Sequence, residues 1–102
     1  MIQRGQINEL EQKLSGNTCI VQAVEKHEEK NLSPLFPNRL IKILPNELGE
    51  ITDLKINQDY VNITIKWPEN RFINYSLQDC QKAPFEILRY VPKDHPAQQK
   101  LL

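Results

Sequence analysis

Apolar and polar residues alternate most regularly between positions 60 and 77, on either side of the turn Pro68-Glu69-Asn70. If Trp67 faces Arg71 across this turn, one face of the hairpin is apolar: Trp67, Ile65, Ile73, Ile63, Tyr75, Val61 and Leu77. The other face is mostly polar: Lys66, Phe72, Thr64, Asn74, Asn62 and Ser76. A half-buried antiparallel sheet requires this division, and a shift of one residue would destroy it. The pattern predicts strands over 60–67 and 71–76.

Three further short strands are predicted in the same half of the chain, over 39–44, 50–56 and 85–90. They are separated by the turns 45–49 and 57–59, and the compact polar segment 77–81 predicts a single 3₁₀ turn. Five short strands separated by turn residues are typical of a small barrel or sandwich.

The N-terminal segment begins with a helical pattern, because Ile7, Leu10 and Leu14 share one helix face. A helix this short is not stable alone, so we expect it to dock on the barrel, a partner or a second copy. The β-branched run 18–24 predicts one additional strand. The charged run 25–30 predicts a solvated turn or an extension of that strand.

Residues 31–38 contain two prolines, which predict an extended connector in which Leu35 and Phe36 pack on the domain. Residues 33–37 could alternatively be a short linear motif that another protein binds. The expected organisation is a helix, strand and connector over 1–38, a barrel over 39–92 and a C-terminal tail over 93–102.

Residues 39–91 resemble the SH3-like small barrel superfamily in their spacing. The matching segments are 49–54, 61–67, 72–76, the turn 77–80 and 85–88. In such barrels a glycine often precedes a strand with apolar residues three apart, and a bulge bends that strand between two sheets. Gly49, Ile51 and Leu54 fit this spacing. The resemblance implies a mainly β fold: a five-stranded SH3-like barrel with an N-terminal helix and one additional strand.

Composition excludes several classes. With 102 residues the chain is a single domain, and 13 basic residues balance 13 acidic ones. The even spread of charge lacks the basic footprint of most nucleic-acid-binding proteins. No apolar run is long enough to span a membrane, and the N-terminus lacks the apolar core of a signal peptide. We therefore expect a cytoplasmic protein with no membrane partner.

Catalytic and metal-binding motifs are not evident. Cys19, His27, Cys80 and His95 lack the closely spaced pairs that structural zinc sites use. Nothing in the sequence places either histidine beside either cysteine as the base of a nucleophile. Three glycines form no phosphate-binding loop. We expect no enzyme, no cofactor and no metal. The two cysteines are expected to be small buried residues, and a redox-sensing pair is the alternative.

These observations predict a non-catalytic protein-interaction module: an adaptor, inhibitor or small accessory subunit, with homo-oligomerisation possible. The candidate partner-binding residues are Tyr60, Phe72, Lys66, Arg71, Leu35 and Phe36, together with the helix face of Ile7, Leu10 and Leu14. The alternative is a KOW-like or Tudor-like nucleic-acid-binding module. Its phosphate contacts would come from Lys42, Lys55, Lys66, Arg71, Lys82 and Arg89, with Phe72 stacking on a base.

Overall fold

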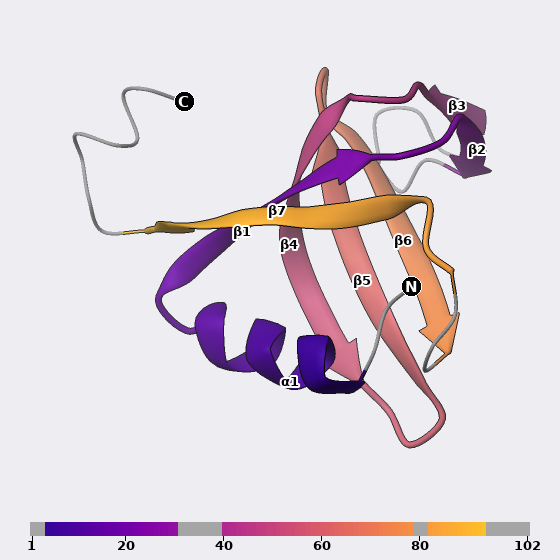
Figure 1. Ribbon diagram of the computed structural model, residues 1–102. Coiled ribbons are helices and arrows are strands. Elements are labelled where there is room, and N and C mark those ends of the chain that lie inside the picture. The colour runs from indigo at the N-terminus through magenta and orange to yellow at the C-terminus, as the bar shows by residue number, and fades with distance from the viewer. Residues whose placement is uncertain (1–3, 31–39, 79–81, 94–102) are drawn as a thin grey trace.

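The computed structural model describes residues 4–30, 40–78 and 82–93, and this part of the chain is mainly β (Figure 1). Helix α1 (Arg4–Lys13) comes first. The strands that follow are β1 (Asn17–Ala23), β2 (His27–Lys30), β3 (Leu40–Ile43), β4 (Leu48–Ile56), β5 (Tyr60–Trp67), β6 (Arg71–Gln78) and β7 (Phe85–Pro92). The single helix and the predominance of strands agree with the fold class predicted from the sequence.

The main sheet has five strands in the order β6-β5-β4-β1-β7, and every neighbouring pair is antiparallel. The predicted membership of this sheet was wrong in one strand. The segment treated as additional is β1, an interior strand of the main sheet between β4 and β7. Alternate β1 side chains, those of Cys19, Val21 and Ala23, are buried in the core, which explains why this strand belongs to the main sheet.

The segment predicted as the first barrel strand lies in a separate two-stranded sheet. There β3 pairs with β2, with His27 opposite Ile43 and Lys30 opposite Leu40. The charged run 25–30 is therefore neither a turn nor an extension of β1, because its last four residues form a strand of their own. Ile41 and Ile43 of β3 are buried, whereas the β2 residues that follow His27 are exposed. The small sheet therefore contacts the core mainly through β3.

The β5–β6 hairpin has the register predicted from the alternation of residues. Trp67 pairs with Arg71, Ile65 with Ile73 and Ile63 with Tyr75. The apolar face is buried, with Trp67 1% exposed. The predicted 3₁₀ turn was wrong at its start, because Leu77 and Gln78 continue β6; residues 79–81 lie outside the described part. Leu77 extends the inward alternation of Ile73 and Tyr75, and its burial favours the strand.

Strand β4 is shared between two parts of the sheet. It pairs with β1 from Leu48 to Ile51 and with β5 from Glu50 to Ile56. Its register with β5 shifts between Ile51 and Asp53, which is the bulge expected after Gly49. In Figure 1, β7 runs across the β4–β5–β6 meander, so the sheet curls strongly on itself.

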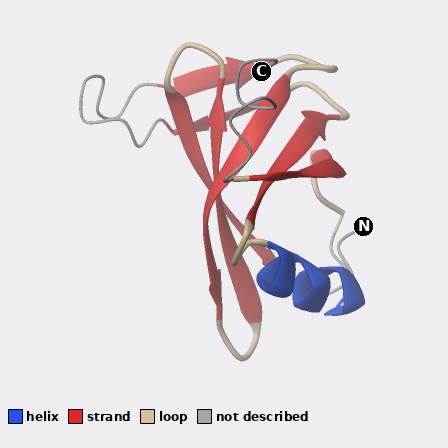
Figure 2. Cartoon of the chain, turned by 90° about the vertical axis from the view of Figure 1, so that its left-hand side faces the viewer, coloured by secondary structure: helices blue, strands red, loops and turns tan. Residues whose placement is uncertain are grey.

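The apolar side of helix α1 packs against the hydrophobic core of the domain. Ile7 and Leu10 are buried in the core cluster, and Leu14 packs against it. Of the three docking sites expected for the helix, the chain's own core is the one it takes, and the prediction that Ile7 and Leu10 form a partner surface was wrong because both are buried. Figure 2 shows the helix on one side of the strands, near one end of the sheet. Within the described residues, no helix has the length and apolar character needed to cross a membrane.

A hydrogen-bonded chain of aromatic residues joins β2 to the main sheet. The Trp67 indole Nε1 donates to the Tyr75 hydroxyl at 3.1 Å, and that hydroxyl lies 2.6 Å from Nε2 of His27. His27 Nδ1 lies 3.0 Å from the Glu25 carbonyl. A carbonyl can only accept, so His27 Nδ1 donates to Glu25, and in the neutral imidazole Nε2 then accepts from the Tyr75 hydroxyl. Phe85 adds an edge contact to Tyr75, with ring centroids 5.0 Å apart.

Candidate functional site

A gap opens in the main sheet where β4 and β5 stop pairing. Their ladder ends at Glu50 and Lys66. Beyond this pair β4 continues beside β1 to Leu48, and β5 continues beside β6 to Trp67. The next hydrogen-bonding step would place Leu48 opposite Pro68. Proline has no N–H to donate, so the ladder cannot continue there.

The direction of the Leu48 backbone follows from the alternation of the β1–β4 bonds. The Ala23 N–H donates to the Glu47 carbonyl at 2.9 Å, so Glu47 faces β1. In an antiparallel pair alternate residues face the same neighbour. Gly49 therefore also faces β1, whereas the N–H and C=O of Leu48 point toward β5, into the gap.

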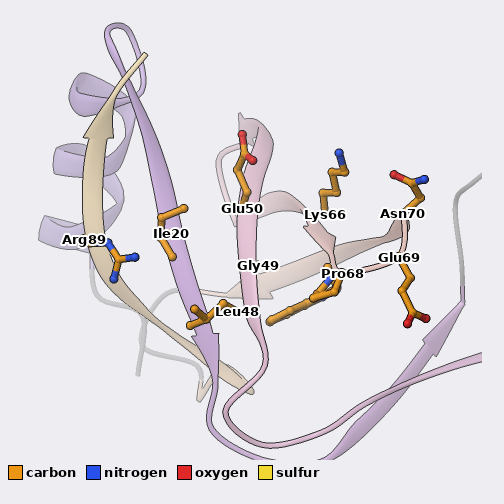
Figure 3. Close-up of a pocket in the computed structure, with 10 residues that line it drawn as sticks. Ile20, Leu48, Gly49, Glu50, Lys66, Pro68, Glu69, Asn70 and Arg89 are labelled. Carbon is orange, nitrogen blue, oxygen red and sulfur yellow. The ribbon is translucent and has the colours of Figure 1, made fainter. Parts of the chain in front are cut away.

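A pocket of about 470 Å³ occupies this gap and opens to solvent. Its lining residues come from the four strands β1, β4, β5 and β7 and one turn: Ile20, Leu48, Gly49, Glu50, Lys66, Trp67, Pro68, Glu69, Asn70 and Arg89. In Figure 3 Gly49 lies at the centre, Ile20 and Arg89 lie on the β1–β7 side, and Lys66, Pro68 and Asn70 lie on the opposite side. The volume is within the range of ligand-binding sites.

Gly49 permits the close approach of β4 to the core beneath the pocket. A Cβ atom at this position would lie 2.7 Å from Cγ2 of Ile65 and 2.8 Å from Cε3 of Trp67. Both distances are too short for carbon atoms in contact, so only glycine fits without a shift of the indole. Gly49 thus brings Trp67 into the pocket lining, although Trp67 is almost fully buried.

The turn that forms one wall of the pocket has an unusual backbone. Glu69 has φ 67° and Asn70 has φ 59°, which is the left-handed region. Asparagine tolerates this conformation, but glutamate adopts it at a cost. The next residue holds the turn in place, since Arg71 Nε donates to the Pro68 carbonyl at 2.7 Å.

Arg71 also joins this wall to the segment that precedes β4. Its guanidinium donates to the Lys42 carbonyl at 2.9 Å and forms an ion pair with Glu47. Burial raises the pKa of the Glu47 carboxyl, but hydrogen bonds from Arg71 and from the Leu44 N–H outweigh it and lower that pKa. These contacts fix two chain segments on either side of the gap.

One row of outward-facing side chains crosses all five strands at the pocket. Arg89 lies opposite Ile20, Ile20 opposite Glu50, Glu50 opposite Lys66, and Lys66 opposite Phe72. This row therefore contains charges of both signs, with the neighbouring pair Glu50 and Lys66 flanked by the apolar side chains of Ile20 and Phe72. Leu48, 45% exposed, adds apolar surface beside it.

The structure brings together only some of the residues predicted for partner binding. Lys66 is in the pocket, Phe72 is its half-buried cross-strand neighbour, and Arg71 follows the pocket wall. Tyr60 is exposed at the other end of β5, opposite Gln78. Leu35 and Phe36 lie outside the described residues. The partner-binding role of these six residues stays a prediction.

Of the lining residues, sequence reasoning proposed Lys66 for partner binding and Arg89 only for the nucleic-acid alternative, and it did not identify Ile20, Leu48 or Gly49 as binding residues. Their strands are distant in sequence, so the alternation pattern gives no sign that they meet. One signal was available in Pro68. A proline directly after a paired strand marks the end of a ladder on one side.

The basic residues proposed for phosphate contact in the nucleic-acid alternative do not form one free positive patch. Arg71 is paired with Glu47, and Lys82 lies 3.8 Å from Glu25. Lys66 and Arg89 do share the pocket, where Glu50 and Glu69 accompany them. The local charge at the pocket is therefore balanced.

Two of the candidate zinc ligands, Cys80 and His95, lie outside the described residues. Among the residues that the structure describes, no three His, Cys, Asp or Glu side chains are grouped to hold a metal ion. Cys19 is buried as a free thiol, and burial raises its pKa to about 11. A thiol with this pKa is a poor nucleophile at neutral pH.

Comparison with known proteins gives no relative: no protein family, curated protein or solved structure matches this chain.

Proposed function

We propose that the chain is a non-catalytic protein-interaction module built on an SH3-like small barrel, acting as an adaptor, inhibitor or small accessory subunit. The observation that carries this proposal is the pocket at the end of the β4–β5 ladder. Its centre is apolar, with Ile20, Leu48 and Pro68, and its rim carries charges of both signs. An apolar centre within a polar rim is the usual anatomy of a protein–protein interface.

Three features support the SH3-like part of the proposal. Strand β4 carries a bulge after Gly49. The same strand is shared between β1 and β5, as in a sheet that folds over on itself. The first and last strands of the sheet-forming chain, β1 and β7, lie side by side and cross the meander (Figure 1).

The balance of charge favours a protein over a polyanion. Lys66 and Arg89 could contact phosphates, but Glu50 and Glu69 line the same pocket and would repel them. Nucleic-acid binding depends on neutralising phosphates and weakens steeply with salt. An interface with an apolar centre depends much less on salt.

Affinity capture from native lysate tests the proposal, with nuclease treatment and a high-salt wash before mass spectrometry. We expect a stoichiometric protein partner to survive both steps. Loss of every partner after either step would contradict the proposal. The matched pair of baits is the wild-type chain and a variant with Leu48→Asp, which places a charge on the pocket surface.

One observation favours the nucleic-acid alternative. Lys66 and Phe72 face each other across β5 and β6 on the outer side of the sheet, so a cation adjoins an aromatic ring. Such a pair can hold a phosphate and stack on a base. Binding of a labelled single-stranded oligonucleotide, weakened by salt and by Lys66→Ala, would support this alternative.

A further inference from the structure

We propose that the pocket binds one extended segment of a partner polypeptide, which pairs with the backbone of Leu48 and places an apolar side chain over Gly49. The inference rests on the proposed function, because it names the kind of segment that the interaction module would recognise. It adds a binding mode, a site and a side-chain preference.

The backbone geometry identifies the occupant as an extended chain. The N–H and C=O of Leu48 point into the gap as a donor and acceptor on one residue. Pro68, at the facing position, cannot donate to them. A residue in β conformation offers the complementary N–H and C=O, and exposed strand edges are commonly recognised in this way. The affinity would come from main-chain hydrogen bonds.

The floor of the pocket explains the side-chain preference. The side-chain direction of Gly49 points into the core, at Ile65 and Trp67, so the pocket side of this residue presents only backbone on which a partner side chain can lie. Ile20 and Leu48 border this space on one side and Pro68 on the other. A buried polar group here would lack a partner among these side chains, so an apolar anchor is favoured.

The rim limits the charge of the segment. Arg89 and Lys66 are countered by Glu50 and Glu69, so the pocket as a whole attracts neither an anionic nor a cationic chain. We therefore expect binding that changes little with ionic strength. A single apolar residue with uncharged, strand-forming neighbours fits this rim best.

The contacts of Arg71 fix the walls of the pocket relative to each other. Arg71 fixes the turn through the Pro68 carbonyl and fixes the opposite segment through Glu47 and the Lys42 carbonyl. Pre-organised walls reduce the ordering that binding would otherwise require. The partner segment, and not the pocket, is the part that becomes ordered.

Selection of short random peptides displayed on phage tests the inference. The full-length chain is the bait, and peptides that also bind the Ile20→Asp variant are removed. We expect enrichment of sequences with one apolar residue between strand-forming residues. The absence of enriched sequences, or enrichment of proline-rich or polyanionic ones, would overturn the inference.

Titration of an enriched peptide into the isotope-labelled chain then locates the site by nuclear magnetic resonance. We expect shifts of the backbone amides of Leu48, Gly49, Glu50 and Lys66. Methylation of the peptide nitrogen that pairs with Leu48 should weaken binding about tenfold, the loss of roughly one hydrogen bond. Shifts confined to other residues, or no effect of methylation at any peptide position, would contradict the proposed pairing.

Two substitutions separate this inference from the proposed function. Ile20→Asp should weaken peptide binding about tenfold or more. Leu88→Asp, at an exposed apolar residue of β7 that does not line the pocket, should not. Circular dichroism confirms that both variants fold. If the captured protein partner binds Ile20→Asp as well as wild type, the inference fails and the interaction module stands. If no protein partner is captured, the proposed function fails, whatever the peptides show.

Discussion

Arg71 and Glu47 form an ion pair across the gap beside β4, and both side chains are about four-fifths shielded from solvent. The same guanidinium reaches two backbone carbonyls, those of Pro68 and Lys42. One side chain thus connects the β5–β6 turn, β3 and the segment before β4. The residue predicted from the sequence as a partner contact therefore has a structural role that the sequence did not suggest.

Replacement of Arg71 tests this role. Arg71→Ala removes charge-assisted hydrogen bonds and leaves the Glu47 carboxylate without its cation. We expect the free energy of unfolding to fall by about 1–3 kcal/mol. The control is Lys55→Ala, at an exposed position of β4. Urea denaturation measures both, and equal losses would show that Arg71 contributes no more than a surface residue.

The Glu47 carboxyl predicts a loss of stability in acid. Its pKa in the folded chain is below the ordinary value of 4.5, so its contribution is complete above that value. The contribution is lost as the pH falls through the lower, folded-state pKa. The Glu47→Gln variant should therefore lose less stability than wild type between neutral pH and pH values below 4.5. Parallel stability curves for the two proteins would exclude this linkage.

Gly49 should not tolerate a side chain. Gly49→Ala places a methyl group within 3 Å of Ile65 and Trp67, and we expect it to destabilise the fold by about 1–3 kcal/mol. Gly5→Ala is the matched control, because a Cβ at that helical position meets no atom within 4 Å beyond its chain neighbours and its own helix backbone. It should stabilise the chain by about 0.5–1 kcal/mol. Thermal unfolding of both variants checks the opposite signs.

The left-handed backbone of Glu69 predicts a stabilising substitution. Glycine adopts this conformation without the steric cost that glutamate has, so Glu69→Gly should raise stability by up to about 1 kcal/mol. Glu69→Ala keeps the steric cost and should give no gain. A gain in the alanine variant equal to that of glycine would show that the carboxylate, not the backbone, is unfavourable.

Removal of the Tyr75 hydroxyl should expose the dependence of the core on its hydrogen bonds. Tyr75→Phe leaves the buried Trp67 N–H and the His27 Nε2 without their shared partner. We expect a loss of about 1–3 kcal/mol in urea denaturation. Tyr60→Phe removes an exposed hydroxyl and should cost far less. Similar costs at the two positions would refute the importance of the buried network.

The sequence predicted local structure better than the arrangement of strands. The β5–β6 register was predictable because the two strands are joined by three residues and one face is apolar apart from Arg71 beside the turn. The position of β1 between β4 and β7 was not predictable, since its partners Ile51 and Tyr90 are far away in the chain. Alternation shows that a strand is half-buried, but not which strand lies beside it.

The candidate site was predictable only in part. Lys66 and Phe72 were identified because the hairpin register places them together. Ile20 and Leu48 look like ordinary strand residues, and they become pocket residues only because β4 leaves β5 at Pro68. That separation depends on the three-dimensional course of two strands. A pocket formed by the end of a ladder has little signature in local sequence.

Trp67 is the only tryptophan of the chain, and its indole lies both in the core and in the lining of the pocket. Its emission therefore reports on the pocket without any added label. A segment that settles over Gly49 would change the surroundings of the indole edge, whereas a partner bound at Tyr60 would not. The intrinsic fluorescence of Trp67 can therefore be used to measure binding of a segment in the pocket.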